Sequence, residues 1–122
     1  MIWDGIDQRR FPRVNYKCLI RISEGGREEV IDTFTENIGA GGICVVLEKG
    51  FDLFEKVGLE VSLGGSDEPI HCDGSIVWVV KRHPAKKTEK LKFDTGIEFI
   101  NIQENDRERV SRLVDDIIRS QA

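Results

Sequence analysis

Two short segments of this chain carry side chains suited to binding a nucleotide phosphate. Near the start, three arginines crowd into Arg9-Arg10-Phe11-Pro12-Arg13, and further along the chain reads Asn37-Ile38-Gly39-Ala40-Gly41-Gly42. The planar guanidinium of arginine can donate two parallel hydrogen bonds to a phosphate or to the O6/N7 edge of guanine, and it can stack on a purine. The two segments therefore predict a site for a guanine-bearing phosphate ligand.

The length and charge of the chain limit what else it can be. Its 122 residues suffice for one hydrophobic core and a single folded domain. The net charge of −4 and the isoelectric point near 5.2 exclude a protein that coats nucleic acid through bulk electrostatics. Any anion must therefore be bound by a local cluster of cations.

The chain carries no recognisable targeting or membrane segment. No apolar run is long enough to cross a bilayer, and the first residues lack the features of a signal peptide. We therefore expect a cytoplasmic protein. Its three cysteines are widely spaced in apolar, strand-like runs, which predicts buried, reduced thiols at Cys18, Cys44 and Cys72.

Most of the chain has the hydrophobic pattern of short β-strands. Apolar residues alternate with polar ones over 14–23, 57–63 and 93–99, which is typical of half-buried strands. The continuous apolar runs 43–47 and 76–80 predict strands buried on both faces, and 28–36 makes a sixth strand. Glycine-containing turns separate these segments, so the simplest arrangement is an antiparallel meander. Closing it into a barrel would remove its exposed edges.

The end of the chain changes to a helical period. Apolar residues recur at helical spacing, with Asn105 as the expected N-cap, at Val110, Leu113, Val114, Ile117 and Ile118. This amphipathic stripe is expected to pack on the barrel or cover one of its ends, and a dimer interface is the alternative. The predicted fold is mainly β, a six-stranded antiparallel barrel with a C-terminal amphipathic helix.

The predicted organisation is one domain over 9–120 behind a tail over 1–8. Within the domain we assign residues 9–13 to an arginine arm, 14–100 to the barrel and 105–120 to the helix.

The spacing of the two motifs in a small barrel resembles the PilZ domain family, which binds the bacterial second messenger cyclic di-GMP. The resemblance covers about residues 8–118. It rests on Arg9-x-x-x-Arg13 and Asn37-x-Gly39-x-x-Gly42, and on two later strand signatures, Gly74-Ser75-Ile76-Val77-Trp78 and Gly96-Ile97-Glu98-Phe99. Each fragment alone is a weak pattern, and their order and strand context together carry the resemblance.

The resemblance implies a ligand site between an arm and a turn. In the family the arm wraps over a ligand seated against the turn, so Arg9 and Arg13 would contact guanine edges and phosphates, with Arg10 as a further partner. Asn37 would bond a guanine face, while Gly39 and Gly42 would allow close backbone approach and positive φ. The implied ligand is cyclic di-GMP, and no cofactor or metal is implied.

One position departs from the family pattern. Gly39 stands where the family usually has serine, so a hydroxyl is missing. Losing one neutral hydrogen bond costs about 0.5 to 1.5 kcal/mol, which corresponds to roughly three- to tenfold in affinity. We therefore expect a cyclic di-GMP receptor with weakened binding.

Other chemistry has little support in the sequence. His71 and His83 belong to no metal-binding motif, and no nucleophile or carboxylate pair with catalytic spacing is present, so the chain is expected to be a binding module and not an enzyme. Trp78 is interpreted as a core residue. The basic stretch Lys81–Lys92 is either a solvated hairpin loop or a surface for an acidic protein or nucleic acid, but only His83 offers an aromatic face there. No nucleic-acid partner is therefore expected.

Two functional hypotheses remain. In the first, the arginine arm orders over cyclic di-GMP and alters a contact with an unidentified protein; in related proteins such partners belong to motility, pilus or exopolysaccharide machinery. In the second, the chain is a PilZ-like adaptor that does not bind cyclic di-GMP and acts through protein interaction only.

Overall fold

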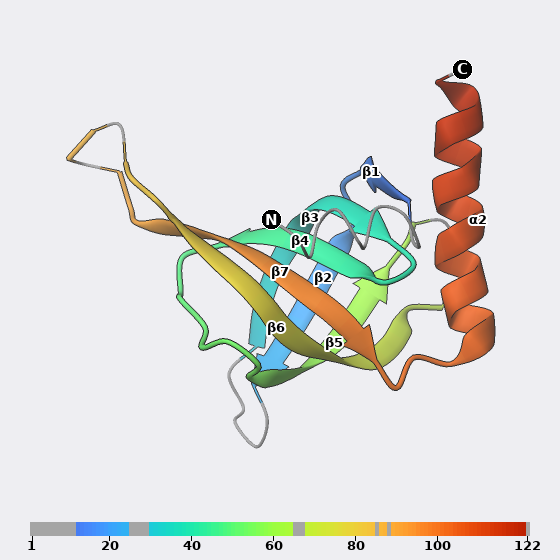
Figure 1. Ribbon diagram of the computed structural model, residues 1–122, viewed down its shortest axis with the longest axis horizontal. Coiled ribbons are helices and arrows are strands. Elements are labelled where there is room, and N and C mark those ends of the chain that lie inside the picture. Colours follow the sequence, from blue (N-terminus) through green and yellow to red (C-terminus); the bar gives the residue numbers. More distant parts are fainter. Residues whose placement is uncertain (1–11, 25–29, 65–67, 85, 88, 122) are drawn as a thin grey trace.

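The computed structural model describes residues 12–24, 30–64, 68–84, 86–87 and 89–121 (Figure 1). Within these residues, seven strands precede one helix: β1 (Arg13–Asn15), β2 (Leu19–Glu24), β3 (Val30–Gly39), β4 (Gly42–Leu47), β5 (Lys56–Ser62), β6 (Ile70–Arg82), β7 (Lys92–Ile100) and α2 (Glu104–Ser120). The predicted tail over 1–8 and most of the arginine arm lie outside the described residues, so the division into tail, arm and domain stays a prediction.

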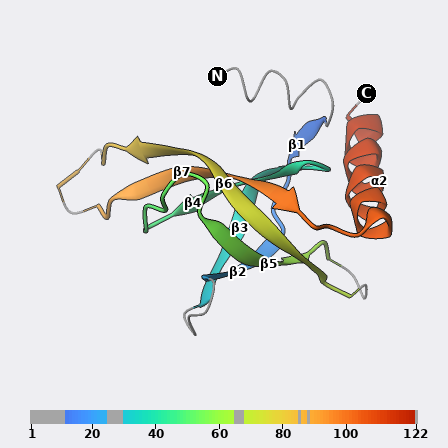
Figure 2. The ribbon, with the colours of Figure 1, turned by 60° about the horizontal axis from the view of Figure 1, so that its bottom comes forward.

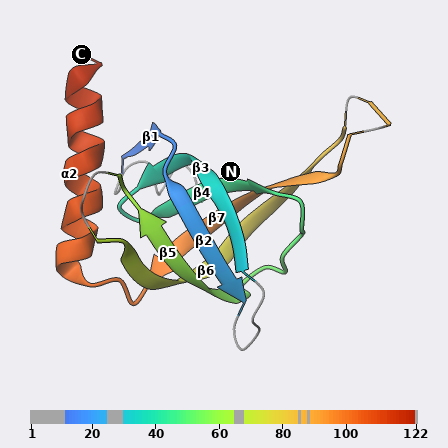
Figure 3. The same ribbon diagram turned by 180° about the vertical axis from the view of Figure 1, so that it is seen from behind.

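Six of the strands close into an antiparallel barrel. They follow the order β3-β2-β5-β6-β7-β4, and pairing of β3 with β4 closes the ring, while β1 pairs with β3. The predicted six-stranded barrel with a C-terminal helix is confirmed. The simple meander is wrong, because β4 is paired with β7 and β5 with β2 (Figures 1 and 3). Alternation along a strand reports which face is buried but not which strand lies beside it.

Isoleucines in register fill the centre of the barrel. Ile38, Ile43, Ile97 and Ile76 oppose one another across β3, β4, β7 and β6, and each has 0% of its surface exposed. Burying one such side chain stabilises the fold by about 1.5–3 kcal/mol. This row fixes the register of the four strands, because a slip of one residue would turn the isoleucines outward.

The predicted strand 14–23 is interrupted at its centre. Thr35 on β3 is buried, and its hydroxyl donates to the carbonyl of Tyr16 at 2.6 Å and accepts from the backbone N–H of Cys18 at 2.9 Å. The side chain of Thr35 thereby satisfies backbone groups in the gap between β1 and β2. The pairing of β3 with β4 shifts register next to the same residue. The alternation of buried residues continues across the gap at Val14 and Cys18.

The two continuous apolar runs have different surroundings. Residues 43–47 are buried apart from the half-buried Val46, as predicted. The prediction of burial on both faces is wrong for 76–80, since Val80 is 48% exposed. The reason is that β6 leaves β5 after Ser75, so Val80 has a neighbouring strand, β7, on one side only, and the ends of β6 and β7 extend away from the barrel (Figures 1 and 2).

Helix α2 packs on the barrel, as one of the two interpretations of its apolar stripe predicted. Val110 and Val114 are buried in the same core as the barrel residues, and the helix contacts β1 and β3. The helix begins at Glu104, and its N-cap is Gln103, not the expected Asn105. Among the described residues, no helix is long and apolar enough to span a bilayer.

Replacing Thr35 with valine should destabilise the fold. Thr35→Val removes the hydroxyl that bonds the part-buried carbonyl of Tyr16 and the buried N–H of Cys18, and such losses cost about 2–3 kcal/mol. Thr35→Ser keeps the hydroxyl and loses one methyl group, at about 1 kcal/mol. Urea unfolding measures both. Equal destabilisation by the two variants would show that the methyl, not the hydroxyl, matters.

Candidate functional site

The pairing of β1 with β3 brings four of the predicted site residues together. Arg13 opposes Gly39, and two positions along the ladder Asn15 opposes Asn37. Gly39 in turn opposes Gly42 across the turn between β3 and β4. The remaining two predicted residues, Arg9 and Arg10, lie outside the described residues.

These residues share the outer face of the barrel. Residues directly opposite in a ladder project to the same face, and their immediate neighbours project to the other. One row across the strands contains Asn37, Cys44, Gly96 and Trp78, and the next contains Arg13, Gly39, Gly42 and Glu98. The isoleucine row between them faces the core. The outer surface therefore has glycines at its centre and arginine, asparagine and tryptophan at its margins.

Asn37 carries an unused acceptor. Its Oδ1 atom is buried, and it accepts no hydrogen bond from any part of the chain that the structure describes. A buried polar atom without a partner costs about 1–3 kcal/mol, so a donor placed here would gain more than an ordinary surface hydrogen bond. Guanine offers such donors on its N1 and N2 atoms.

Gly42 is required by the packing of the barrel itself. A methyl group on Gly42 would overlap the carbonyl oxygen of Ile97 and lie 3.1 Å from Cα of Glu98. The backbone N–H of Phe99 donates to the carbonyl of Gly41 at 2.9 Å, which holds β7 close to the turn. The expected positive φ in this turn is wrong: of the glycines in the described ranges, only Gly64 has one, at 101°.

Trp78, which sequence reasoning assigned to the core, lies on the same face of the barrel as the candidate site residues. Its indole lies over Gly96, where an added methyl group would overlap the ring. The side chain is half-buried on the outer face, in the same cross-strand row as Asn37. The available signal was Gly96, a glycine inside a strand, which often marks a close approach by another group.

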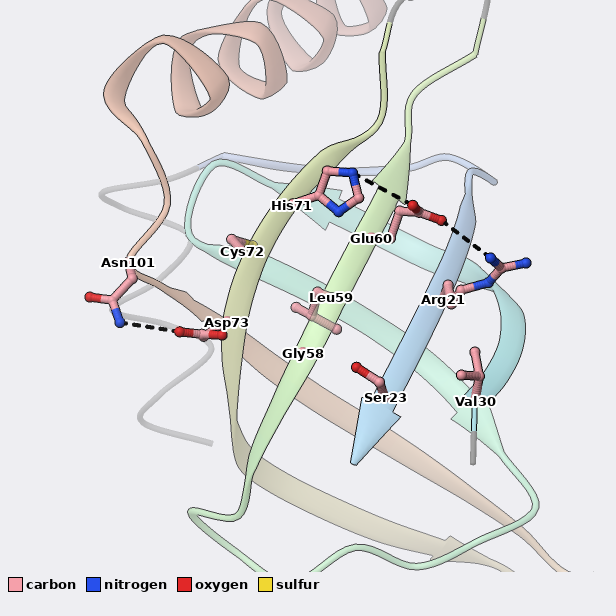
Figure 4. A pocket seen from close by; sticks show the side chains of 10 residues that line it. All are labelled: Arg21, Ser23, Val30, Gly58, Leu59, Glu60, His71, Cys72, Asp73 and Asn101. Carbon is pink, nitrogen blue, oxygen red and sulfur yellow. Dashed lines mark hydrogen bonds and ion pairs between the residues drawn. The ribbon is translucent and has the colours of Figure 1, made fainter. Parts of the chain in front are cut away.

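A hollow lined mainly by β2, β5 and β6 lies apart from these residues, and its side chains do not suggest a functional site (Figure 4). Its polar residues pair with one another: Glu60 lies 3.6 Å from Nε2 of His71 and 3.8 Å from Nη1 of Arg21, and Asn101 donates to Asp73 at 3.2 Å. Exposed ion pairs and hydrogen bonds of this kind contribute little to the stability of the fold. In the described part of the chain, no group of three His, Cys, Asp or Glu residues is arranged to hold a metal.

The thiol of Cys72, which lines this hollow, has a raised pKa. Burial, together with the carboxylates of Asp73 and Asp106, raises the pKa of Cys72 to about 11. Its thiol is therefore protonated at neutral pH, and the thiolate is the nucleophilic form. Cys18 and Cys44 are buried, as predicted, whereas Cys72 is only half-buried, and none of the three forms a disulfide within the described residues.

Comparison with known families identifies the fold. The sequence profile of the PilZ domain matches residues 7–116. This chain therefore belongs to the PilZ domain family. No curated protein matches its sequence.

Solved structures of PilZ proteins have the same fold. MotI/DgrA, the inhibitor of motility of Bacillus subtilis, superposes with a TM-score of 0.72 at 26% identity, over 93% of this chain and 51% of that chain. The PilZ domain of Escherichia coli YcgR, solved with c-di-GMP, superposes with a TM-score of 0.70 at 14% identity, over 93% of this chain and 94% of the YcgR domain. MrkH of K. pneumonia superposes with a TM-score of 0.74 at 13% sequence identity, over 89% of this chain and 48% of MrkH. The chain thus spans about half the length of MotI/DgrA and MrkH.

Substitution of Gly42 should destabilise the protein even without ligand. Gly42→Ala places a methyl group against the backbone of β7, which cannot move without disturbing the barrel, and should lower the free energy of unfolding by about 1–3 kcal/mol. Gly58→Ala is the matched control, because its methyl would meet only the Ser23 hydroxyl, at 2.6 Å, and that side chain can rotate. Urea unfolding distinguishes them, and equal stability of the two variants would contradict the packing role of Gly42.

Proposed function

We propose that this chain is a receptor for cyclic di-GMP, bound on the outer face of the barrel between Arg13 and Asn37. The observation that carries the proposal is the β1–β3 register, which sets Arg13 beside Gly39 and within two residues of Asn37. Membership of the PilZ family and the cyclic di-GMP in the solved YcgR domain support it.

The chemistry of the ligand matches the residues at this surface. Cyclic di-GMP has two phosphates and two guanines, and the guanidinium of Arg13 can bond either a phosphate or a guanine O6/N7 edge. The buried Oδ1 of Asn37 can accept from a guanine N–H. Gly39 has no side chain to obstruct a flat base beside Arg13, and Trp78 supplies an aromatic surface at the other end of the Asn37 row.

The arginine arm supplies the remaining cations in this proposal. Arg13 is the first residue of β1, so the arm joins the barrel beside the glycine turn. An extended chain advances about 3.3 Å per residue, so Arg9 can reach about 13 Å from Arg13 and fold back over a bound nucleotide. Ordering of this arm would convert ligand concentration into a change of surface.

The proposed output is a protein contact and not a reaction. The described residues present binding groups at the candidate site without a paired nucleophile and base. Because MotI/DgrA is an inhibitor of motility, motility machinery is one class of partner proposed for this chain. Pilus and exopolysaccharide machinery are further classes.

A specific observation favours one alternative function. Gly39 lacks the hydroxyl that the family usually places there, so the chain could act as an adaptor that contacts its partner without ligand. The two functions differ in a direct binding measurement.

Isothermal titration with cyclic di-GMP tests the receptor. The unmodified protein should give saturable heat in the micromolar range. Arg13→Ala should weaken binding by about 10- to 100-fold, because it removes a charged hydrogen-bond donor, and Asn37→Ala by about tenfold. Arg21→Ala is the control, since Arg21 is exposed and pairs with Asp32 at 2.9 Å on a different part of the barrel. A flat titration of folded, unmodified protein would refute the receptor and leave the adaptor.

Restoring the family's hydroxyl gives an independent test. Gly39→Ser should tighten binding by roughly three- to tenfold, the value of one neutral hydrogen bond. The same titration measures it, with Gly58→Ala, on β5 and outside the candidate site, as the comparison. An unchanged dissociation constant for Gly39→Ser would show that the missing hydroxyl does not limit affinity.

A further inference from the structure

The ribbon formed by the ends of β6 and β7 extends away from the barrel (Figures 1 and 2). From Ile76 onward β6 pairs with β7 and no other described strand, and Lys92 at the start of β7 opposes Arg82. We call residues Lys81–Lys92, as far as the structure describes them, the basic ribbon. The candidate ligand site uses none of them.

The basic ribbon has the opposite charge to the rest of the protein. It carries six cations and one acid, Glu89, a net charge of +5. Since the whole chain has a net charge of −4, the remainder carries −9. The segregation is therefore strong, and it places the positive charge at the part of the molecule that projects furthest in Figure 1.

Few of these cations are neutralised within the protein. Arg82 donates from Nε to both carboxylate oxygens of Asp94, at 3.0 and 2.9 Å, and Lys90 lies 3.7 Å from Glu48. The other four lysines are exposed and form no ion pair within the described parts of the chain; they are Lys81, Lys86, Lys87 and Lys92. Their charges are available to a partner.

The ribbon is braced where it leaves the barrel. A two-stranded hairpin alone is marginally stable in water. Here the Arg82–Asp94 pair joins the two strands, and the ring of Phe93 lies against Gly50 in the β4–β5 connection. At the far end the N–H of Glu89 donates to the carbonyl of Lys86 at 3.1 Å. A preorganised ribbon loses less conformational entropy when it docks.

We propose that the basic ribbon is a docking arm for an acidic protein surface. Single-strand nucleic-acid sites combine cations with aromatic rings that stack on bases, and His83 is the only aromatic residue between Lys81 and Lys92. The −9 charge of the remainder also repels a long polyanion that runs past the ribbon. Membrane-binding segments insert several apolar side chains, whereas Leu91, which is 37% exposed, is the one large apolar side chain among the described residues of the basic ribbon. A localised acidic patch on a protein can pair with the exposed lysines, and it needs neither stacking aromatic rings nor inserted apolar side chains.

Fluorescence anisotropy with three labelled probes tests the proposal. The probes are an oligoglutamate peptide, an oligothymidylate, and vesicles of phosphatidylcholine with phosphatidylglycerol. The unmodified protein should bind oligoglutamate most tightly of the three probes. Its affinity for oligoglutamate should fall roughly tenfold between low salt and an ionic strength of about 0.15 M, because salt screens the attraction between the lysines and the carboxylates. Lys86→Glu/Lys87→Glu should weaken oligoglutamate binding by about tenfold or more.

The matched control changes the net charge by the same amount elsewhere. Lys17→Glu/Lys56→Glu alters two exposed lysines outside the ribbon, and it should leave oligoglutamate binding within about twofold of the unmodified protein. Equal losses in the two double variants would overturn the proposal, because binding would then follow net charge alone. Tighter binding of oligothymidylate or vesicles than of oligoglutamate would overturn the assignment to a protein partner. Circular dichroism verifies that each variant is folded.

Discussion

The hydroxyl of Thr35 is the interaction on which the geometry of the candidate site depends. It bonds to the backbone at Tyr16 and Cys18, in the gap between β1 and β2. This allows one strand, β3, to pair with β2 over its first half and with β1 over its second. Without that division the chain would have no separate β1, and Arg13 would not be held in register with Gly39. A buried polar side chain inside the barrel therefore determines where a cation stands on its surface.

The glycines of the family signatures have packing roles that can be named. Gly96 lies under the indole of Trp78, and Gly42 lies against the backbone of β7. Gly74 faces Ile97, where an added methyl would come within 2.6 Å of Cγ2. These contacts join β4, β6 and β7 closely, so much of what identifies the family in sequence maintains the barrel. The residues with ligand chemistry, Arg13 and Asn37, stand at the edge of this glycine surface.

The fold was largely predictable from the sequence because most strands bury one face and expose the other. The alternation at Ile20 and Ile22 and the helical spacing of Val110 and Val114 both correspond to buried positions. The partners of the strands were not predictable, because the pairing of β4 with β7 depends on contacts between distant segments. The exposure of Val80 was missed for a related reason: an apolar run does not show where a strand leaves the barrel.

The candidate site was predictable in part. Arg13, Gly39 and Asn37, which the motif resemblance grouped in one site, are neighbours because β1 and the end of β3 pair directly, while their roles in ligand binding stay predictions. The outward position of Trp78 depends on a shift in the pairing of β6 with β7 between Ile76 and Trp78. Such a bulge reverses the faces of the residues that follow it, and the apolar sequence of residues 76–80 contains no pattern that predicts a bulge. The roles of Arg9 and Arg10 stay predictions.

The separation of positive ribbon from negative barrel gives the molecule a permanent electric dipole. In the field of a charged surface such a body experiences a torque, so it rotates until its ribbon points toward negative charge before any side chains touch. Screening limits this alignment to separations of about 8 Å at physiological ionic strength. Within that distance fewer encounters begin in an unproductive orientation, so the shape of the charge distribution influences association rate independently of the contacts made afterwards.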